Sequence, residues 1–338
     1  MTTALSAIFV FMLVIVVHEF GHFITAKMVG IKVHEFSIGM GPKLFHKKGE
    51  ETDYYLRAFP IGGYVRMEGE DESSDDPRSF NKKPAWARIL VVAAGAIMNF
   101  ILAIVVFTIV AYNTGTPTTV IDEVIKDSPA YEVGIKTGDK IIRINNIETK
   151  NWKSIVKEIS NSDSKKDMNI TVIRNSKNVD FVLRPKYDEE SKKVIIGIVP
   201  KSEKSFISSV KNGFETTGTV LGLMFQFLRM LFRGQVKSDD LSGPIGVIYT
   251  VGEAAKYGFI NVLYLLGFIS VNLGFFNLLP IPALDGSRIL FLLIELFRGK
   301  PMNPEKEGFV HFIGFVLLLA LMVFVTYSDI VRFQLFRR

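Results

Sequence analysis

The stretch Val16-Val17-His18-Glu19-Phe20-Gly21-His22-Phe23 lies near the N-terminus and contains the pattern His-Glu-x-x-His. On a helix, residues four positions apart share one face, so His18 and His22 can bind the same tetrahedral Zn²⁺. Glu19 is placed to take a proton from a water molecule on that metal. Because the five-residue pattern also arises by chance, a buried pair of structural histidines is the competing interpretation.

The motif lies inside an apolar segment. Residues Ala4 to Met28 are almost wholly apolar, and Ile8 to Val17 form an unbroken hydrophobic run. A segment of this length can span the hydrocarbon core of a bilayer as a helix. Ionisable side chains are costly in that environment and by default mark a functional site. The stretch therefore predicts a transmembrane helix that carries a metal site.

Composition agrees with an α-helical membrane protein. Three further apolar segments, near residues 88–112, 259–279 and 309–327, are long enough to span a bilayer. The chain is 48% hydrophobic yet 22% charged, so its charges must be concentrated in aqueous segments. The net charge of +6 is modest and basic residues alternate with acidic ones, which gives no indication of nucleic-acid binding. Without cysteine, a metal must be held by His, Asp or Glu.

Two of these other apolar segments carry polar groups of interest. The third ends in Asn277-Leu278-Leu279-Pro280-Ile281-Pro282-Ala283-Leu284-Asp285-Gly286. Its two prolines break the helix at membrane depth, which is tolerated where the freed backbone groups line a protein-enclosed cavity. Asp285 is the natural third ligand for the metal site of the first helix, and a helix N-cap is its alternative role. In the second segment, the small residues Ala93-Ala94-Gly95-Ala96 indicate close helix packing, and Asn99 either makes a packing hydrogen bond or belongs to a site.

The segment between the first two apolar runs predicts a small membrane-associated β-sheet. Residues 36–42 and 53–59 have the composition of short strands, and residues 64–67 resume as a strand after a turn at Pro60-Ile61-Gly62-Gly63. An exposed edge of this sheet could pair with an extended peptide.

Residues 116–202 differ from the rest of the chain in composition. Their pattern around Gly134-Ile135-Lys136-Thr137-Gly138-Asp139 resembles a PDZ domain, an α+β module that binds extended peptides by strand addition. An unrelated small β domain is the alternative. Residues 206–232 then repeat apolar side chains at helical spacing with charges between them, which predicts a helix on the membrane surface.

Basic residues near the ends of the apolar segments predict the orientation in the membrane. Residues 1–7 carry no Lys or Arg, whereas residues 29–87 and 288–307 carry several. This places the N-terminus outside, those two segments in the cytoplasm, and the PDZ-like domain outside. We therefore expect four parts: the first two transmembrane helices with the sheet over 1–115, the PDZ-like domain over 116–202, a membrane-surface helix and linker over 203–257, and the last two transmembrane helices over 258–338.

The chain resembles the site-2 protease family of intramembrane zinc metalloproteases over nearly its whole length. The resemblance is carried, in order, by His18-Glu19-Phe20-Gly21-His22, Gly39-Met40-Gly41-Pro42, Pro60-Ile61-Gly62-Gly63-Tyr64-Val65, the PDZ-like insertion, and the stretch from Asn277 to Gly286. More narrowly, the chain looks like the bacterial RseP and RasP type with a single PDZ domain. The resemblance implies cleavage, in the plasma membrane of a bacterial cell, of single-span proteins such as anti-sigma factors after a first protease has trimmed their outer domain.

The expected mechanism gives each motif a role. Zinc is held by His18, His22 and Asp285 and keeps an open position for water. Glu19 accepts the proton of that water and can return it to the leaving amine. Candidates for binding the unwound substrate are the amide of Asn277 and, in the sheet region 36–67, Ile61, Gly62, Gly63 and Tyr64.

The remaining histidines, His34, His46 and His311, lack the spacing of metal ligands, so we expect surface or packing roles for them.

Two other function classes fit the sequence less well. A membrane metal transporter is disfavoured because transport does not require a Glu19 within a His-Glu-x-x-His motif, and the four-span unit is not repeated. A non-catalytic membrane adaptor that uses its PDZ-like domain would tolerate the loss of any metal ligand, which distinguishes it from an enzyme.

Overall fold

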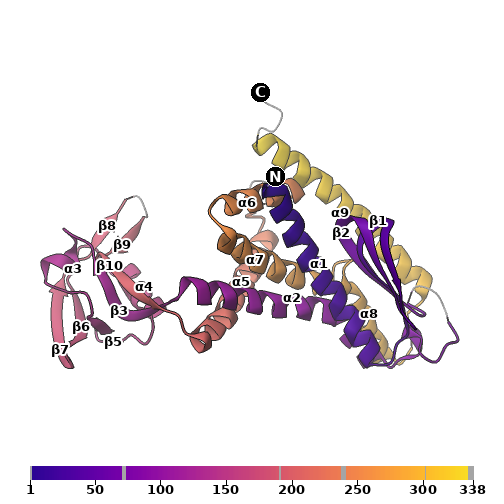
Figure 1. The fold of residues 1–338 in the computed structure, drawn as a ribbon, viewed down its shortest axis with the longest axis horizontal. Helices are drawn as coiled ribbons and strands as arrows, with labels where there is room; N and C mark the ends of the chain where they lie inside the picture. Colours follow the sequence, from indigo (N-terminus) through magenta and orange to yellow (C-terminus); the bar gives the residue numbers. More distant parts are fainter. Residues whose placement is uncertain (1, 71–73, 190–191, 237–240, 301, 334–338) are drawn as a thin grey trace. The chain divides into compact units, whose positions relative to one another are not determined.

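The structure is a computed structural model that describes residues 2–70, 74–189, 192–236, 241–300 and 302–333. The chain divides into two compact units, one formed by residues 1–110 with 213–338 and the other by residues 111–212. The first unit is mainly helical and contains a two-stranded sheet, whereas the second is an α+β insertion (Figure 1).

The helical unit contains the apolar segments expected from the sequence. Its helices are α1 (Thr2–Met28), α2 (Ala85–Thr114), α5 (Phe206–Phe232), α6 (Pro244–Lys256), α7 (Phe259–Asn277), α8 (Asp285–Arg298) and α9 (Pro304–Arg332), with a 3-10 turn η1 (Phe80–Lys82) before α2. Among the residues that the structure describes, four helical segments are long and apolar enough to cross a membrane: Thr3–Met28, Ala85–Thr114, Phe259–Asn277 and Glu305–Arg332. This confirms the expected α-helical membrane architecture with four spans.

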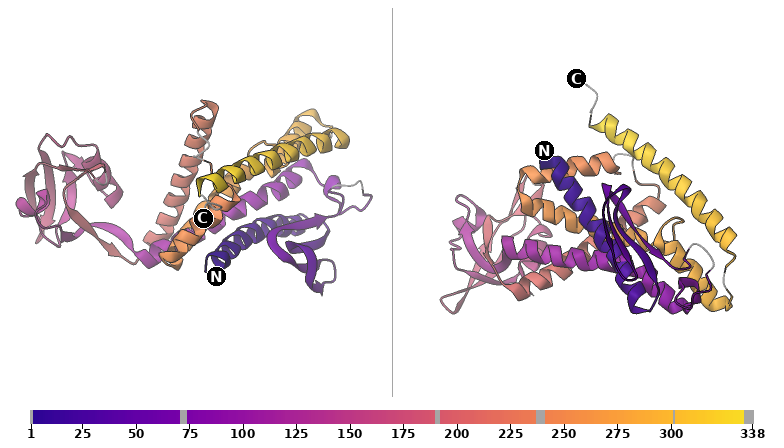
Figure 2. Two further views of the ribbon diagram at one scale, coloured as in Figure 1. Left: turned by 90° about the horizontal axis from the view of Figure 1, so that it is seen from above. Right: turned by 45° about the vertical axis from the view of Figure 1, so that its right-hand side comes forward.

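Apolar side chains from several helices form the core beside the first span. Val10 and Val14 of α1 are fully buried with Val106 of α2, Val251 of α6 and Leu266 of α7. In the right-hand view of Figure 2, α9, drawn in yellow, lies at the periphery of this unit. Only 11% of the most apolar stretch of α9 is buried, which suits a helix that faces lipid.

The sheet beside α1 is built from two long strands, β1 (Val33–Lys48) and β2 (Asp53–Met67), which pair antiparallel. Residues 33–38 of β1 pair with two parts of β2, since Phe36 lies opposite both Val65 and Tyr54. The segment 63–67 is therefore an edge of the sheet, and no strand among the described residues pairs with its other side. The expected turn at 60–63 is wrong, because these residues continue β2.

A helix that the sequence did not indicate follows the broken third span. Residues Asp285–Arg298 form helix α8, within and before the segment 288–307 that was assigned only to the cytoplasm. This helix ends at Gly299, whose φ of 66° is the left-handed conformation that glycine adopts readily. Leu292 of α8 joins a core with Ala26 of α1 and Val91 of α2, so α8 is packed against α2 and against α1, which carries the first metal motif.

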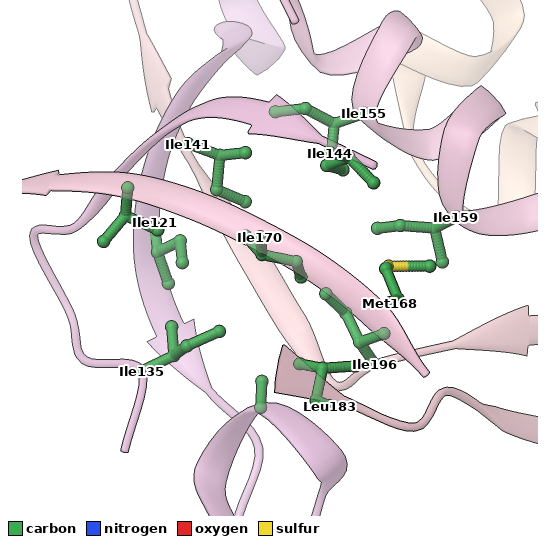
Figure 3. Packing of buried hydrophobic residues seen from close by; sticks show 12 residues of the cluster. Ile121, Ile135, Ile141, Ile144, Ile155, Ile159, Met168, Ile170, Leu183 and Ile196 are labelled. Atoms are coloured by element: carbon green, nitrogen blue, oxygen red, sulfur yellow. The ribbon is translucent and has the colours of Figure 1, made fainter. Parts of the chain in front are cut away.

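The inserted unit is an α+β domain. Its elements are β3 (Thr116–Val124), α3 (Pro129–Glu132), β4 (Lys140–Ile144), β5 (Ile147–Glu148), α4 (Trp152–Ser160), β6 (Met168–Arg174), β7 (Lys177–Leu183), β8 (Lys186–Asp188), β9 (Lys193–Ile195) and β10 (Ile198–Glu203). The main sheet has the order β10-β3-β4-β6-β7, with β5 paired to β4. Figure 3 shows Ile141, Ile144 and Ile170 from this sheet together with Ile155 of α4 in one buried cluster, the core expected of a small independent domain.

Candidate active site

The structure brings together His18, His22 and Asp285 from opposite ends of the sequence. Both histidines lie on α1 and are 8% and 9% exposed, and Asp285 is the first residue of α8. The Nε2 atom of His18 lies 3.2 Å from Nε2 of His22 and 3.2 Å from Oδ2 of Asp285. Three potential ligand atoms thus converge within 4.8 Å of one another, which is the arrangement that a small tetrahedral cation requires.

The chemistry of Asp285 indicates that this cluster fits a metal. Its Oδ2 atom is buried and has no hydrogen-bond partner among the described residues, although both imidazole Nε2 atoms lie within 3.5 Å. A buried carboxylate oxygen without a partner is costly, and a bound cation removes that cost. Two neutral imidazoles and one carboxylate form a donor set that zinc accepts.

Partners on α2 determine which ring nitrogen of each histidine is available. The Nδ1 atom of His22 lies 2.9 Å from the backbone oxygen of Val91. Because a carbonyl only accepts, this Nδ1 carries the proton and Nε2 keeps its lone pair for a metal.

The corresponding partner of His18 is Asn99, which is fully buried. Its Nδ2 atom lies 3.2 Å from Nδ1 of His18, and its Oδ1 atom has no hydrogen-bond partner among the described residues. Turning the amide by 180° lets Oδ1 accept from a protonated Nδ1. That orientation satisfies the buried oxygen and leaves Nε2 of His18 free to bind a metal.

Gly95 of α2 leaves the space that the two imidazoles occupy. A Cβ atom at this position would lie 2.4 Å from Nε2 of His22 and 2.7 Å from Cε1 of His18. A Cβ on Gly21 would similarly lie 2.4 Å from the backbone oxygen of Ala94, so α1 and α2 approach closely at the motif. The sequence indicated close packing at Gly95 but not its contact with the imidazoles, because that contact depends on the register between two helices.

Glu19 lies against the edge of the sheet. A Cβ on Gly63 of β2 would lie 3.1 Å from Cγ of Glu19 and 2.8 Å from the backbone oxygen of Ser37. The absence of a side chain at Gly63 therefore lets the Glu19 carboxyl group lie between the metal motif and the edge segment of β2.

The remaining predicted substrate-binding residues occupy different surroundings. The Nδ2 atom of Asn277 lies 3.5 Å from Nε2 of His18, so this amide faces the cluster. Ile61 lies within β2, and its side chain falls outside the described part of the structure. Gly62 has a φ of 85°, and a Cβ there would lie 2.7 Å from Cε of Met40.

Tyr64 directs its hydroxyl group into a network within the sheet. The hydroxyl donates to Glu35 and accepts a 2.7 Å hydrogen bond from Arg57. Burial raises the pKa of Tyr64, and the hydrogen bond to Glu35 raises this pKa further, so the hydroxyl stays a neutral donor. The side chain of Tyr64 thus stabilises the sheet, and its contribution to binding would come from the backbone.

Of the other three histidines, His34 and His46 lie in the sheet, whereas His311 contacts the loop that leads to Asp285. His34 bonds to Glu68, and His46 stacks on Tyr55 with ring centroids 4.4 Å apart, so both have structural partners. His311 of α9 bonds to the backbone of Ala283 in the loop before Asp285. That contact was not foreseen from the sequence, because it joins residues 28 positions apart across a loop and a helix.

Comparisons with known proteins agree with this geometry. The model of peptidase family M50 matches residues 6–321. The chain is 42% identical to a candidate zinc metalloprotease of Clostridium acetobutylicum, with 96% of each chain covered. It is 34% identical to the regulator of sigma-W protease RasP of Bacillus subtilis, with 98% of each covered, and 33% identical to the zinc metalloprotease RasP of Bacillus licheniformis, with 98% and 99% covered.

One solved structure resembles part of the chain. The PDZ domain of the SdrC-like protein of Listeria monocytogenes matches with 20% identity and a TM-score of 0.23, covering 25% of this chain and 87% of that one. At that score the likeness has no bearing on function. The family match and the relatives, by contrast, extend over nearly the whole chain. The chain belongs to peptidase family M50, the site-2 protease family, and is a zinc metalloprotease of the membrane.

Proposed function

We propose that this protease holds its zinc ion with His18, His22 and Asp285 and hydrolyses peptide bonds within the transmembrane segments of single-span proteins. The observation that carries the proposal is the convergence of these three ligand atoms within 4.8 Å at the point where α1 meets the start of α8. Family membership favours a protease over a metal transporter or a non-catalytic adaptor.

When bound, zinc lowers the pKa of a water molecule in its open position and polarises the scissile carbonyl. The neighbouring residues of the chain supply the rest of the chemistry. The Glu19 carboxylate accepts the proton from the attacking water and delivers it to the nitrogen of the leaving amine as the C–N bond breaks. His22 and His18 keep their Nε2 lone pairs directed at the cluster through the contacts of their Nδ1 atoms.

Substrate binding is assigned to the groups beside this cluster. The amide of Asn277, 3.5 Å from Nε2 of His18, can donate to a backbone carbonyl of the substrate. The segment Ile61 to Tyr64 leads into the unpaired edge of the sheet beside Glu19, where an extended peptide can add as a further strand. A transmembrane helix satisfies all its backbone groups internally, so it must unwind before a carbonyl can reach this site.

The substrate class and the membrane are inferred from the relatives and the charge distribution. One relative is named for the regulation of sigma-W, which supports anti-sigma factors, cut first by another protease, as substrates. The bacterial relatives support a location in the bacterial plasma membrane, and the Lys and Arg distribution supports a PDZ-like domain outside. We also retain the functional division into residues 1–115, 116–202, 203–257 and 258–338.

One set of variants tests the assignment of the site. Glu19→Gln should retain zinc and lose about 10²- to 10⁴-fold in cleavage rate, because the ligands remain and the proton acceptor is lost. Asp285→Ala should lower both bound zinc and cleavage, whereas Asn277→Ala should lower cleavage with zinc retained. The measurements are metal analysis of the purified folded protein and cleavage of a single-span substrate. Native-rate cleavage by Glu19→Gln, or full zinc occupancy in Asp285→Ala, would contradict the corresponding role.

A further inference from the structure

The loop that delivers Asp285 to the site contains a residue in a disfavoured backbone conformation. Ala283 has a φ of 74°, in the left-handed region that residues with a Cβ atom seldom adopt. Only Leu284 separates this residue from Asp285, which begins α8. The direction in which Asp285 leaves the loop therefore depends on contacts that hold Ala283 in this conformation.

One such contact comes from α9. The backbone N–H of Ala283 donates to Nδ1 of His311 across 3.1 Å. Because a backbone N–H can only donate, Nδ1 of His311 carries the lone pair and Nε2 carries the proton. The Nε2 atom is buried without a hydrogen-bond partner among the described residues, and Oε1 of Glu307 lies 3.9 Å away.

A second contact lies one turn further along the same face of α9. A Cβ atom on Gly314 would lie 2.2 Å from Cβ of Pro282 and 2.6 Å from its carbonyl oxygen. The backbone of α9 therefore lies directly against the loop at Pro282. On the side of α8, a Cβ atom on Gly286 would lie 2.1 Å from the carbonyl oxygen of Leu279, so the loop is closely packed there as well.

Two of the residues in these contacts, Ala283 and His311, line a cavity that Asp285 also lines. The cavity has a volume of about 410 Å³, and its lining includes Ala283, Asp285, Arg288, His311 and Phe315. His311 is thus close to Asp285, but the structure gives it a hydrogen bond to the loop backbone.

We infer that His311 and Gly314 of α9 hold Ala283 in its left-handed conformation and thereby position the Asp285 carboxylate for zinc. His311 is a positioning residue in this account: it acts through the Ala283 backbone. The inference rests on the proposed role of Asp285 as a ligand. It also gives the fourth span a function in the metal site, to which it supplies no ligand.

The test measures zinc affinity of the full-length protein in detergent by competition with a chelator, with cleavage as a second readout. His311→Leu removes the acceptor and should weaken zinc binding measurably, by less than the about 10- to 100-fold that losing a direct hydrogen-bond partner of a ligand costs, because His311 acts through the Ala283 backbone. His311→Asn should stay close to wild type, because its Oδ1 atom can replace Nδ1 as the acceptor for the Ala283 N–H. Phe309→Leu, on an exposed position of α9, is the matched control and should leave affinity unchanged.

A double variant distinguishes positioning from a chemical role of the imidazole. Glycine adopts positive φ without the penalty of a Cβ atom, so Ala283→Gly should restore most of the zinc affinity lost in His311→Leu. If instead the Nε2–H group were the important feature, His311→Asn would be as weak as His311→Leu and Ala283→Gly would restore nothing. That result would overturn the inference, as would unchanged zinc affinity in His311→Leu.

Two further variants separate a failure to fold and a wrong ligand assignment from a failure of the inference. Gly314→Ala displaces Pro282 from the other contact and should also weaken zinc binding, so it replaces His311→Leu if that variant does not fold; unchanged affinity there contradicts the inference equally. Asp285→Ala is measured in parallel. Unchanged zinc in Asp285→Ala would contradict the proposed ligand, whereas a loss in Asp285→Ala without a loss in the α9 variants would contradict only the positioning role.

Discussion

Each histidine of the metal motif depends on a residue of α2 that orients its ring. Val91 fixes His22 through a backbone oxygen, which no side-chain substitution removes. Asn99 approaches His18 through a side chain and can be changed. The amide of Asn99 therefore offers a direct test of whether these outer contacts matter for the metal.

We expect Asn99→Leu to lower zinc affinity about 10- to 100-fold, because His18 then loses the acceptor that keeps its proton on Nδ1. Asn99→Asp has the same shape and retains an acceptor, so it should bind zinc nearly as well as wild type. Chelator competition on the two purified proteins is the measurement. Equal losses in both variants would show that Asn99 contributes by packing alone.

At this scale the sequence indicates the candidate ligands but not the residues that contact them. His18 and His22 follow from helical spacing, and Asp285 follows from an acidic residue beside a proline-broken span. The contacts of Val91 and Asn99 join residues 69 and 81 positions from their histidines. Such contacts depend on how α2 packs against α1, and no local pattern in the sequence encodes that register.

At the scale of the elements, the metal site depends on the close packing of α1 against α2. Gly95→Ala would place a methyl group 2.4 Å from Nε2 of His22, so the imidazoles or the helices must move. We expect loss of zinc binding with the helical content retained. The matched control is Gly222→Ala in α5, where a Cβ meets nothing within 4 Å; there alanine should be neutral or stabilise the helix by up to about 1 kcal/mol. Native zinc affinity in Gly95→Ala would show that the crossing can widen without disturbing the ligands.

The edge of β2 provides the next test. Proline at position 64 removes a backbone donor and fixes φ, so Tyr64→Pro should impair cleavage while zinc is retained. Tyr64→Phe loses only the hydroxyl contacts to Glu35 and Arg57 and keeps the backbone N–H, which makes it the control. Cleavage assays with one substrate compare the two. A fully active proline variant would exclude docking at this edge, and an equal defect in Tyr64→Phe would assign the effect to the side-chain network.

Local patterns identified the long apolar helices more reliably than the short amphipathic ones. Residues 60–63 were expected to turn because proline and glycine favour turns, but pairing along β1 carries the strand through them. The sequence did not indicate α8, which has charged residues among its apolar ones. In the structure two of these charges have partners, since Glu295 pairs with Arg88 and Arg288 with Glu70. Tertiary pairing of charges is invisible to a search for apolar periodicity.

On the scale of the whole molecule, the charge distribution and the four spans together predict an orientation. Residues 29–87 are rich in Lys and Arg, and retaining such segments in the cytoplasm is the general tendency of membrane proteins. The sheet that carries the edge segment then faces the cytoplasm. With one span between them, residues 116–202 must lie on the opposite side.

The chain contains no cysteine, so a single introduced cysteine reports its own position without background. Lys48→Cys lies on an exposed position of β1, and Lys157→Cys on an exposed position of α4 in the inserted unit. A membrane-impermeant maleimide should label Lys157→Cys in intact cells, and should label Lys48→Cys only after the membrane is permeabilised.

Labelling of both variants in denatured protein shows that each thiol can react, and the cysteine-free chain sets the background. The reverse pattern in intact cells would invert the orientation and place the sheet outside. Equal labelling of both variants in intact cells would place them on the same side, which an odd number of spans between them cannot allow. In that case α2 would not cross the membrane between the sheet and the inserted unit, and the edge segment could not receive a substrate from the cytoplasmic side.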